Sequence, residues 1–125
     1  MDSDRLAEVF EMRVKFMQAL KDSNASGATE WPLDLSQKKN QQYVRDIALR
    51  GVEEMFEALQ HLKNWKPHRV TDIAEFNRDE FLEEVIDAFN YFFELVLLTG
   101  FSADEFFEMY QRKDKVIHDR LSSGY

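Results

Sequence analysis

Cysteine is absent from the chain, and proline and glycine are scarce, with two and four among 125 residues. The lack of cysteine excludes disulfides, thiolate zinc sites and a cysteine nucleophile, and it is compatible with a reducing cytoplasm. Because so few prolines and glycines interrupt the chain, and no period-two alternation persists, helices are expected throughout. The sequence therefore predicts an all-α protein, with one domain over residues 1–125.

Positive charge is also in short supply, with 16 Lys and Arg against 24 Asp and Glu, a formal net charge of -8. Nucleic-acid binding depends on neutralising phosphates with Lys and Arg, so we expect no nucleic-acid partner. The most apolar run, residues 81–98, contains four acids that would be costly in lipid, and the charged N-terminus does not resemble a signal peptide. We therefore expect no membrane partner. An acidic chain can still bind a phosphate-bearing small molecule through divalent cations.

The spacing of apolar residues predicts four long helices, which is typical of an antiparallel four-helix bundle. They are expected over residues 4–20, 36–62, 77–100 and 102–121. Ser36 is a candidate N-cap. Asn77 and Ser102 each precede a glutamate by three residues, as in a capping box, and Gly100 suits the position after a helix end.

The third predicted helix is apolar over most of its circumference but carries a narrow acidic stripe. At 100° per residue the stripe spans an arc of roughly 80°. Its members are Glu80, Glu84, Asp87, Tyr91 and Glu94. Burying several carboxylates together is costly, because each resists desolvation and repels the next. Either the stripe reaches solvent through a groove or it holds cations. The apolar remainder of the helix surface predicts that this helix is central in the fold or buried in an oligomer interface.

A second acidic group lies on the second predicted helix, within an arc of roughly 100°. It comprises Glu53, Glu54 and Glu57. Alone it would be typical of a solvated surface, but facing the first stripe it could hold two Mg²⁺ ions in a geometry that suits phosphoryl substitution. A di-iron carboxylate bundle requires Glu-x-x-His on two helices, and none of His61, His68 and His118 follows a glutamate by three residues.

Two motifs in these helices resemble the signature of a known superfamily. Residues 53–57 match E-E-x-x-E and residues 84–87 match E-x-x-D, separated by the 26 residues 58–83. The pair resembles the all-α nucleoside triphosphate pyrophosphatases, the superfamily of MazG and the dimeric dUTPases. Trp65-Lys66 and the tail from Tyr110 to Tyr125 resemble the dimeric dUTPase branch, and the short chain resembles its compact, phage-encoded members.

The resemblance implies a hydrolase that uses Mg²⁺, or Mn²⁺ in its place, to convert a deoxynucleoside triphosphate, most simply dUTP, to the monophosphate and pyrophosphate. The implied metal ligands are Glu53, Glu54, Glu57, Glu84 and Asp87, and Glu54 is also the implied base for the attacking water. The implied substrate contacts are Lys66, Asn90, Lys113, Lys115, Arg120 and Tyr125. Candidates for the base pocket are Trp65, Asn90, Tyr91, Trp31 and Phe10, although each aromatic residue could equally belong to the core.

The resemblance also implies a homodimer or homotetramer in the cytoplasm, which would be the host cytoplasm for a phage-encoded protein. Asn90, Asp114 and His118 replace the His, Asn and Asn usual in dimeric dUTPases, so the same chemistry on dCTP or dGTP stays open. A hypothesis of another class is a non-catalytic helical adaptor whose acidic groove binds a basic partner.

Overall fold

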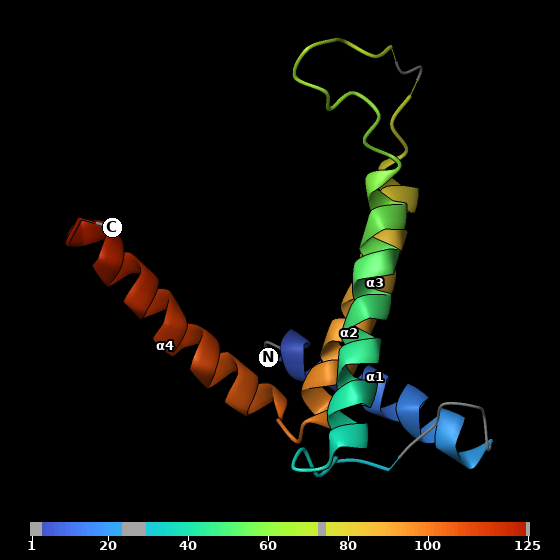
Figure 1. The fold of residues 1–125 in the computed structure, drawn as a ribbon, viewed down its shortest axis with the longest axis vertical. Coiled ribbons are helices and arrows are strands. Elements are labelled where there is room, and N and C mark those ends of the chain that lie inside the picture. Colours follow the sequence, from blue (N-terminus) through green and yellow to red (C-terminus); the bar gives the residue numbers. More distant parts are fainter. Residues whose placement is uncertain (1–3, 24–29, 73–74, 125) are drawn as a thin grey trace. The chain divides into compact units, whose positions relative to one another are not determined.

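Four α-helices and no strand make up the regular structure of residues 4–23, 30–72 and 75–124, which are the residues that the computed structural model describes. The helices are α1 (Arg5–Asp22), α2 (Lys38–Leu59), α3 (Arg78–Leu98) and α4 (Ala103–Ser122) (Figure 1). The all-α prediction is confirmed for this part of the chain. The largest difference from the predicted bounds is at α2, which begins two residues later and ends three residues earlier.

Capping side chains explain most of the helix ends. Ser102 and Glu105 form the predicted capping box of α4, and the Asn77 side chain accepts a hydrogen bond of 3.1 Å from the Glu80 N–H at the start of α3. Gly100, with φ at 91°, follows the end of α3 as predicted. The prediction that Ser36 caps α2 is wrong. Its hydroxyl and backbone N–H both donate to Asp34 Oδ1, at 2.7 and 3.0 Å, so this side chain closes a turn instead.

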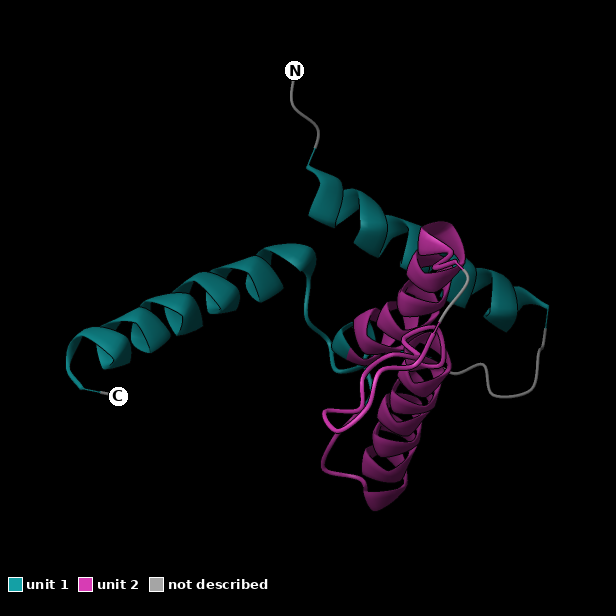
Figure 2. Cartoon of the chain, turned by 90° about the horizontal axis from the view of Figure 1, so that it is seen from above, with its two compact units in different colours: residues 1–33, 96–125 teal, residues 34–95 magenta. Residues whose placement is uncertain are grey.

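The described chain divides into two compact units, residues 1–33 with 96–125 and residues 34–95 (Figure 2). In the first unit, α1 contacts α4, and the Phe10 ring lies 5.8 Å from the Phe106 ring. Phe10 and Met17 are buried there. Leu33 and the end of α3 belong to the same unit, where the Leu33 N–H donates to the Leu98 carbonyl at 2.8 Å.

The second unit is built on an antiparallel helical hairpin of α2 and the larger part of α3. Small residues line the contact between the two helices, because Gly51 and Ala58 of α2 and Ala88 of α3 are all buried. A β-carbon on Gly51 would lie 2.9 Å from the Phe92 ring, which shows how closely the two backbones approach. The hairpin therefore fixes which residues of α2 face which residues of α3.

No single helix within residues 4–23, 30–72 and 75–124 is long and apolar enough to cross a membrane. The two helices α3 and α4, taken together as a bent pair, meet that criterion by length and composition alone.

Candidate functional site

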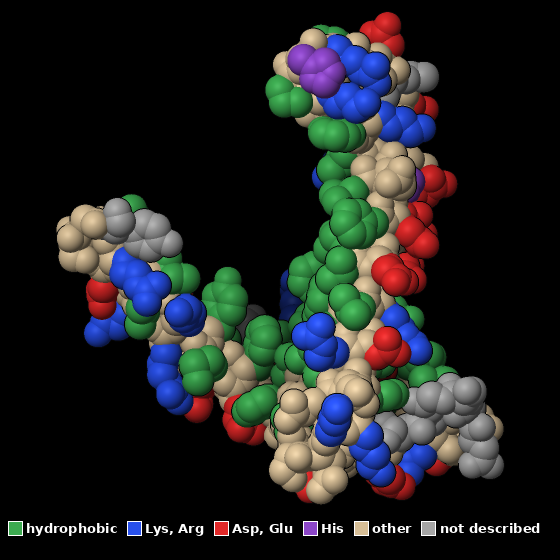
Figure 3. Space-filling view, in the orientation of Figure 1, with side chains coloured by type: hydrophobic (Ala, Val, Ile, Leu, Met, Phe, Trp, Pro, Cys, Tyr) green, Lys and Arg blue, Asp and Glu red, His purple; other side chains and the backbone are tan. Residues whose placement is uncertain are grey.

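The α2–α3 hairpin has one acidic edge and one apolar edge. The acidic edge is defined by Glu53, Glu54, Glu57, Glu84 and Asp87. The apolar edge is defined by the exposed side chains of Leu49, Val52, Phe56, Leu59, Leu82, Ile86 and Phe89. Figure 3 shows acidic side chains along one side of the hairpin and hydrophobic side chains along the other. On α3 the two sets lie on opposite sides because Glu84 and Ile86 are separated by 200° of helix rotation.

The carboxylates predicted as metal ligands gather on this acidic edge. Partial burial raises the pKa of the Glu54 carboxyl above its ordinary value, and so does the neighbouring charge of Glu57. A hydrogen bond between these two carboxyls raises the pKa of Glu54 further. The charges of Asp87 and Glu84, on the facing helix, add to the same effect. Two helices therefore bring four carboxyls close enough for one to retain its proton more tightly.

A histidine outside both acidic motifs also reaches the acidic edge. The Nε2 atom of His61 lies 3.4 Å from the Oε1 atom of Glu84. His61 lies just beyond the end of α2, four residues after Glu57 and seven after Glu54, so it continues the face of the helix that carries them. A search for Glu-x-x-His misses this spacing, whereas Glu-x-x-x-His would have found it.

The residues of the acidic edge suit a hard divalent cation by their chemistry, because carboxylate oxygens are the ligands that Mg²⁺ prefers. Their mutual repulsion gives a reason for a cation to bind, since the Glu54 carboxyl is already driven towards its protonated form. Within the described residues, no group of three or more carboxylate or imidazole side chains is arranged to hold a metal ion as it stands.

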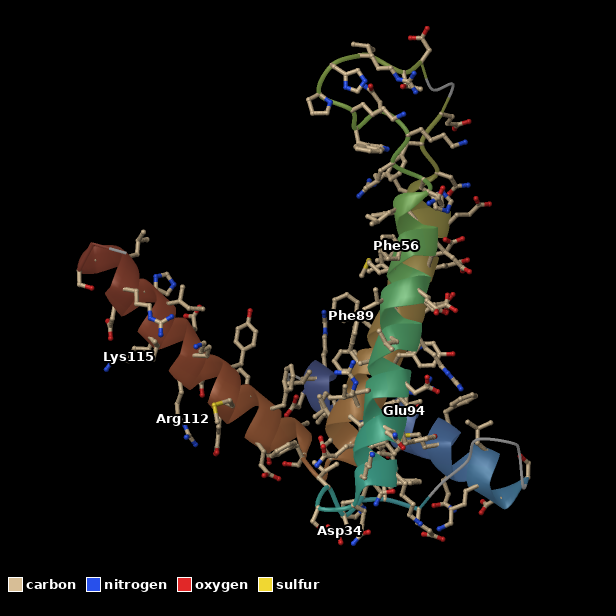
Figure 4. The ribbon with its side chains drawn as sticks, in the orientation of Figure 1. Asp34, Phe56, Phe89, Glu94, Arg112 and Lys115 are labelled. Atoms are coloured by element: carbon tan, nitrogen blue, oxygen red, sulfur yellow. The ribbon has the colours of Figure 1, made fainter. Side chains whose placement is uncertain are left out.

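The acidic stripe of α3 continues beyond the metal-ligand candidates to Glu94, which is buried with 7% of its surface exposed (Figure 4). The pKa of the Tyr43 phenol on α2 is raised by burial and then by the charge of Glu94, against a smaller opposing effect of Arg50. Asn90 and Tyr91 lie between Glu94 and Asp87 on α3, and both are half-buried. A candidate contact for the base or sugar therefore lies about one turn from the carboxylates.

Lys66 lies in a different place from the carboxylates. It lines a pocket of about 700 Å³ at the loop end of α2. The other lining residues are Phe56, Leu59, Gln60, Leu62, Lys63, Trp65, Arg69 and Thr71. The walls thus include apolar-edge side chains, Trp65 and three cations, and none of the five candidate metal ligands. Lys66, which is predicted to bind substrate, therefore lines this pocket and does not lie on the acidic edge.

The basic residues predicted to contact phosphates lie on α4, in the other unit. Lys113, Lys115 and Arg120 are all exposed there, and Figure 4 labels Lys115 on this helix. Their role in substrate binding stays a prediction. Tyr125 lies outside the described residues.

The aromatic candidates for the base pocket separate by burial. Phe10 is buried and packs against Phe106, so it is a core residue. Trp31 is half-buried and is followed by a cis peptide bond to Pro32. Trp65 is 67% exposed, and the Lys66 ammonium lies 5.8 Å from the centre of its ring. Trp65 and Tyr91 therefore remain the candidates that a ligand could reach within the second unit.

Comparison with known proteins finds no matching protein family, no similar curated protein and no similar solved structure. The resemblance to the all-α pyrophosphatases therefore depends on the two acidic motifs and their spacing.

Proposed function

We propose that this protein is a Mg²⁺-dependent hydrolase that converts a deoxynucleoside triphosphate, most simply dUTP, to the monophosphate and pyrophosphate. The observation that supports the proposal is the gathering of three carboxyls, Glu57, Glu84 and Asp87, from two antiparallel helices around Glu54. Glu84 and Asp87 lie on the otherwise apolar helix α3, next to its contact with α2, and metal binding would explain carboxylates at these positions. The fold proposed with this function is the antiparallel bundle of the MazG and dimeric dUTPase superfamily.

In this proposal the acidic edge holds Mg²⁺ through Glu53, Glu54, Glu57, Glu84 and Asp87, with Mn²⁺ able to replace it. The ion would neutralise the triphosphate and lower the pKa of a bound water. Glu54 would take the proton from the attacking water, as a carboxylate positioned beside the bound ion. The oxygen of that water forms a new bond to phosphorus. The bond between the α and β phosphates breaks, and pyrophosphate leaves.

The remaining predicted contacts are assigned to the substrate. Asn90 is proposed to contact the base or sugar, and Lys66, Lys113, Lys115, Arg120 and Tyr125 are proposed to contact the nucleotide, the basic residues by charge-assisted hydrogen bonds to phosphate oxygens. The apolar edge of the hairpin supports a homodimer or homotetramer, because monomeric proteins rarely expose large continuous apolar patches. We propose the cytoplasm as the location of this activity.

The deciding experiment incubates the protein with each deoxynucleoside triphosphate and Mg²⁺ and resolves the products. The proposal expects monophosphate and pyrophosphate in equal amounts, with dUTP as the first substrate to examine and dCTP and dGTP as the alternatives. Glu54→Gln should abolish the reaction, whereas Glu83→Gln, which removes a neighbouring carboxylate from α3, should retain it. Absence of products from every nucleotide would favour the non-catalytic adaptor.

A further inference from the structure

His61 is held at the acidic edge by the backbone and by packing. It follows the end of α2 at Leu59, and its N–H donates to the Ala58 carbonyl at 3.1 Å, so the last turn continues through it. The Phe81 ring lies edge-on to the imidazole, with 6.3 Å between the ring centres and 71° between their planes. Phe76 packs against Phe81 in turn at 5.4 Å. These contacts restrict the orientation of the imidazole independently of its contact with Glu84.

The same geometry places the imidazole on one oxygen of Glu84. Nε2 lies 3.4 Å from Oε1, and the side chains of His61 and Glu84 are 22% and 34% exposed. A neutral imidazole with its proton on Nε2 can donate to Oε1 after a closer approach of a few tenths of an ångström. The second oxygen of Glu84 is then left for a cation. Polar contacts of this kind are often long in unliganded proteins and shorten when the ligand binds.

We propose that His61 is a positioning residue for Glu84, which fixes this carboxylate so that one oxygen accepts from Nε2 and the other binds the metal ion. The inference depends on the metal site of the proposed function and adds a residue outside both acidic motifs. An unrestrained glutamate must lose the freedom of three side-chain torsions when it binds an ion. A carboxylate already held by His61 loses less, so its metal complex is more stable.

The role also connects the site to the loop that follows α2. His61 is at the start of residues 60–77, the segment that joins α2 to α3 and that contains Trp65 and Lys66. The loop is internally tied, because the Asn64 side chain accepts from the Thr71 N–H at 2.9 Å. His61 therefore places one proposed metal ligand in contact with the segment that carries Trp65 and Lys66.

The test separates the hydrogen bond from the packing with two substitutions. His61→Phe keeps a ring against Phe81 but removes the donor, whereas His61→Gln restores a donor at the ε position. His68→Ala is the matched control, because His68 is an exposed histidine seven residues further along the same segment. Circular dichroism verifies that each variant is folded.

Two measurements are made on each variant, and the first requires no substrate. Titration calorimetry with Mn²⁺ alone measures metal affinity, and steady-state hydrolysis of the triphosphate then gives kcat and KM separately. Removing a partner of a metal ligand typically costs about 10–100-fold in metal affinity or activity. We expect His61→Phe to lose affinity for Mn²⁺ and kcat in this range with KM nearly unchanged. His61→Gln should recover most of the loss, and His68→Ala should equal the wild type.

Unchanged Mn²⁺ affinity in His61→Phe would overturn the inference, and it would leave the proposed hydrolase standing if the wild type turns over nucleotide. A His61→Gln variant as weak as His61→Phe would also overturn it, since it would make His61 a direct nitrogen ligand of the ion. If the wild type hydrolyses no nucleotide, the proposed function fails, and the Mn²⁺ titration still decides the positioning role by itself.

Discussion

The Phe92 ring of α3 lies directly over Gly51 of α2, so close that a β-carbon on residue 51 would be 2.9 Å from two of the ring atoms. The same β-carbon would lie 3.2 Å from the Tyr91 β-carbon, which is attached to the α3 backbone and cannot rotate away. Glycine costs a helix about 1 kcal/mol relative to alanine. Its presence here is explained by the close contact of the two helices.

Gly51→Ala should destabilise the protein even though alanine favours the helix. Overpacking costs about 1–3 kcal/mol, so after the gain in helix propensity we expect a net loss of about 1 kcal/mol, measured by urea denaturation. The double variant with Phe92→Leu should recover part of the loss, because the shorter side chain vacates the position of the ring edge. An increase in stability for Gly51→Ala alone would show that the hairpin is less tightly packed than described.

The metal-free protein should become more stable when Glu54 loses its charge. Because the folded-state pKa of Glu54 is raised, the folded protein binds this proton more tightly than the unfolded chain. Stability is therefore lost as the pH rises from the unfolded pKa through the folded one. Glu54→Gln should raise Tm at pH 7 without metal and leave it unchanged near pH 3, where both states hold the proton. Glu83→Gln is the control, and an equal gain from it would assign the effect to net charge.

Asp87 should be essential to turnover if the acidic edge holds the cation. Asp87→Asn keeps the shape of the side chain but removes a charge, so we expect kcat to fall by about 100-fold or more, as for the loss of a metal-site carboxylate or its partners. Mg²⁺ should raise the Tm of the wild type and not that of the variant. An Asp87→Asn variant with full activity would contradict the assignment of this residue as a ligand.

The apolar edge should be covered in solution by a second copy of the chain. Phe56 and Phe89 are 59% and 43% exposed, and Figure 4 labels both on this edge. Burying one such side chain contributes about 1.5–3 kcal/mol, so Phe56→Glu should weaken the dimer at least about tenfold. Light scattering over a range of concentrations measures this. Lys39→Gln changes the net charge by the same amount at an exposed position on the face of α2 that carries Glu57, so it should leave the dimer intact. A monomeric wild type would refute the assembly.

The basic residues of α4 should affect substrate binding if they contact phosphates. A charge-assisted hydrogen bond contributes about 1.5–3 kcal/mol, so Lys113→Gln or Arg120→Gln should raise KM by about 10–100-fold. Arg112→Gln is the control, because Arg112 is exposed on the same helix and is not among the predicted contacts. Equal effects of Arg112→Gln and Lys113→Gln would indicate general electrostatic attraction.

The sequence by itself determined the helical class, most helix ends and the two acidic motifs. These are local properties, since a capping box at Ser102 and Glu105 or a glycine after a helix depends on residues a few positions apart. The 3.6-residue period likewise places Glu84 and Asp87 on one face without knowledge of their neighbours. The prediction that Ser36 caps α2 was wrong because its hydroxyl donates to Asp34 instead. The residue type alone does not show which of two nearby partners a serine hydroxyl will bind.

Only the tertiary structure decided which groups meet across the hairpin. The contact of His61 with Glu84, the effect of Asp87 and Glu84 on the pKa of Glu54, and the closeness of Gly51 to Phe92 all join the α2 side of the hairpin to α3. Such contacts depend on the axial register of two antiparallel helices, and that register is set by the packing of many side chains together. Periodicity fixes the face on which a residue lies, but it leaves open which residue lies opposite.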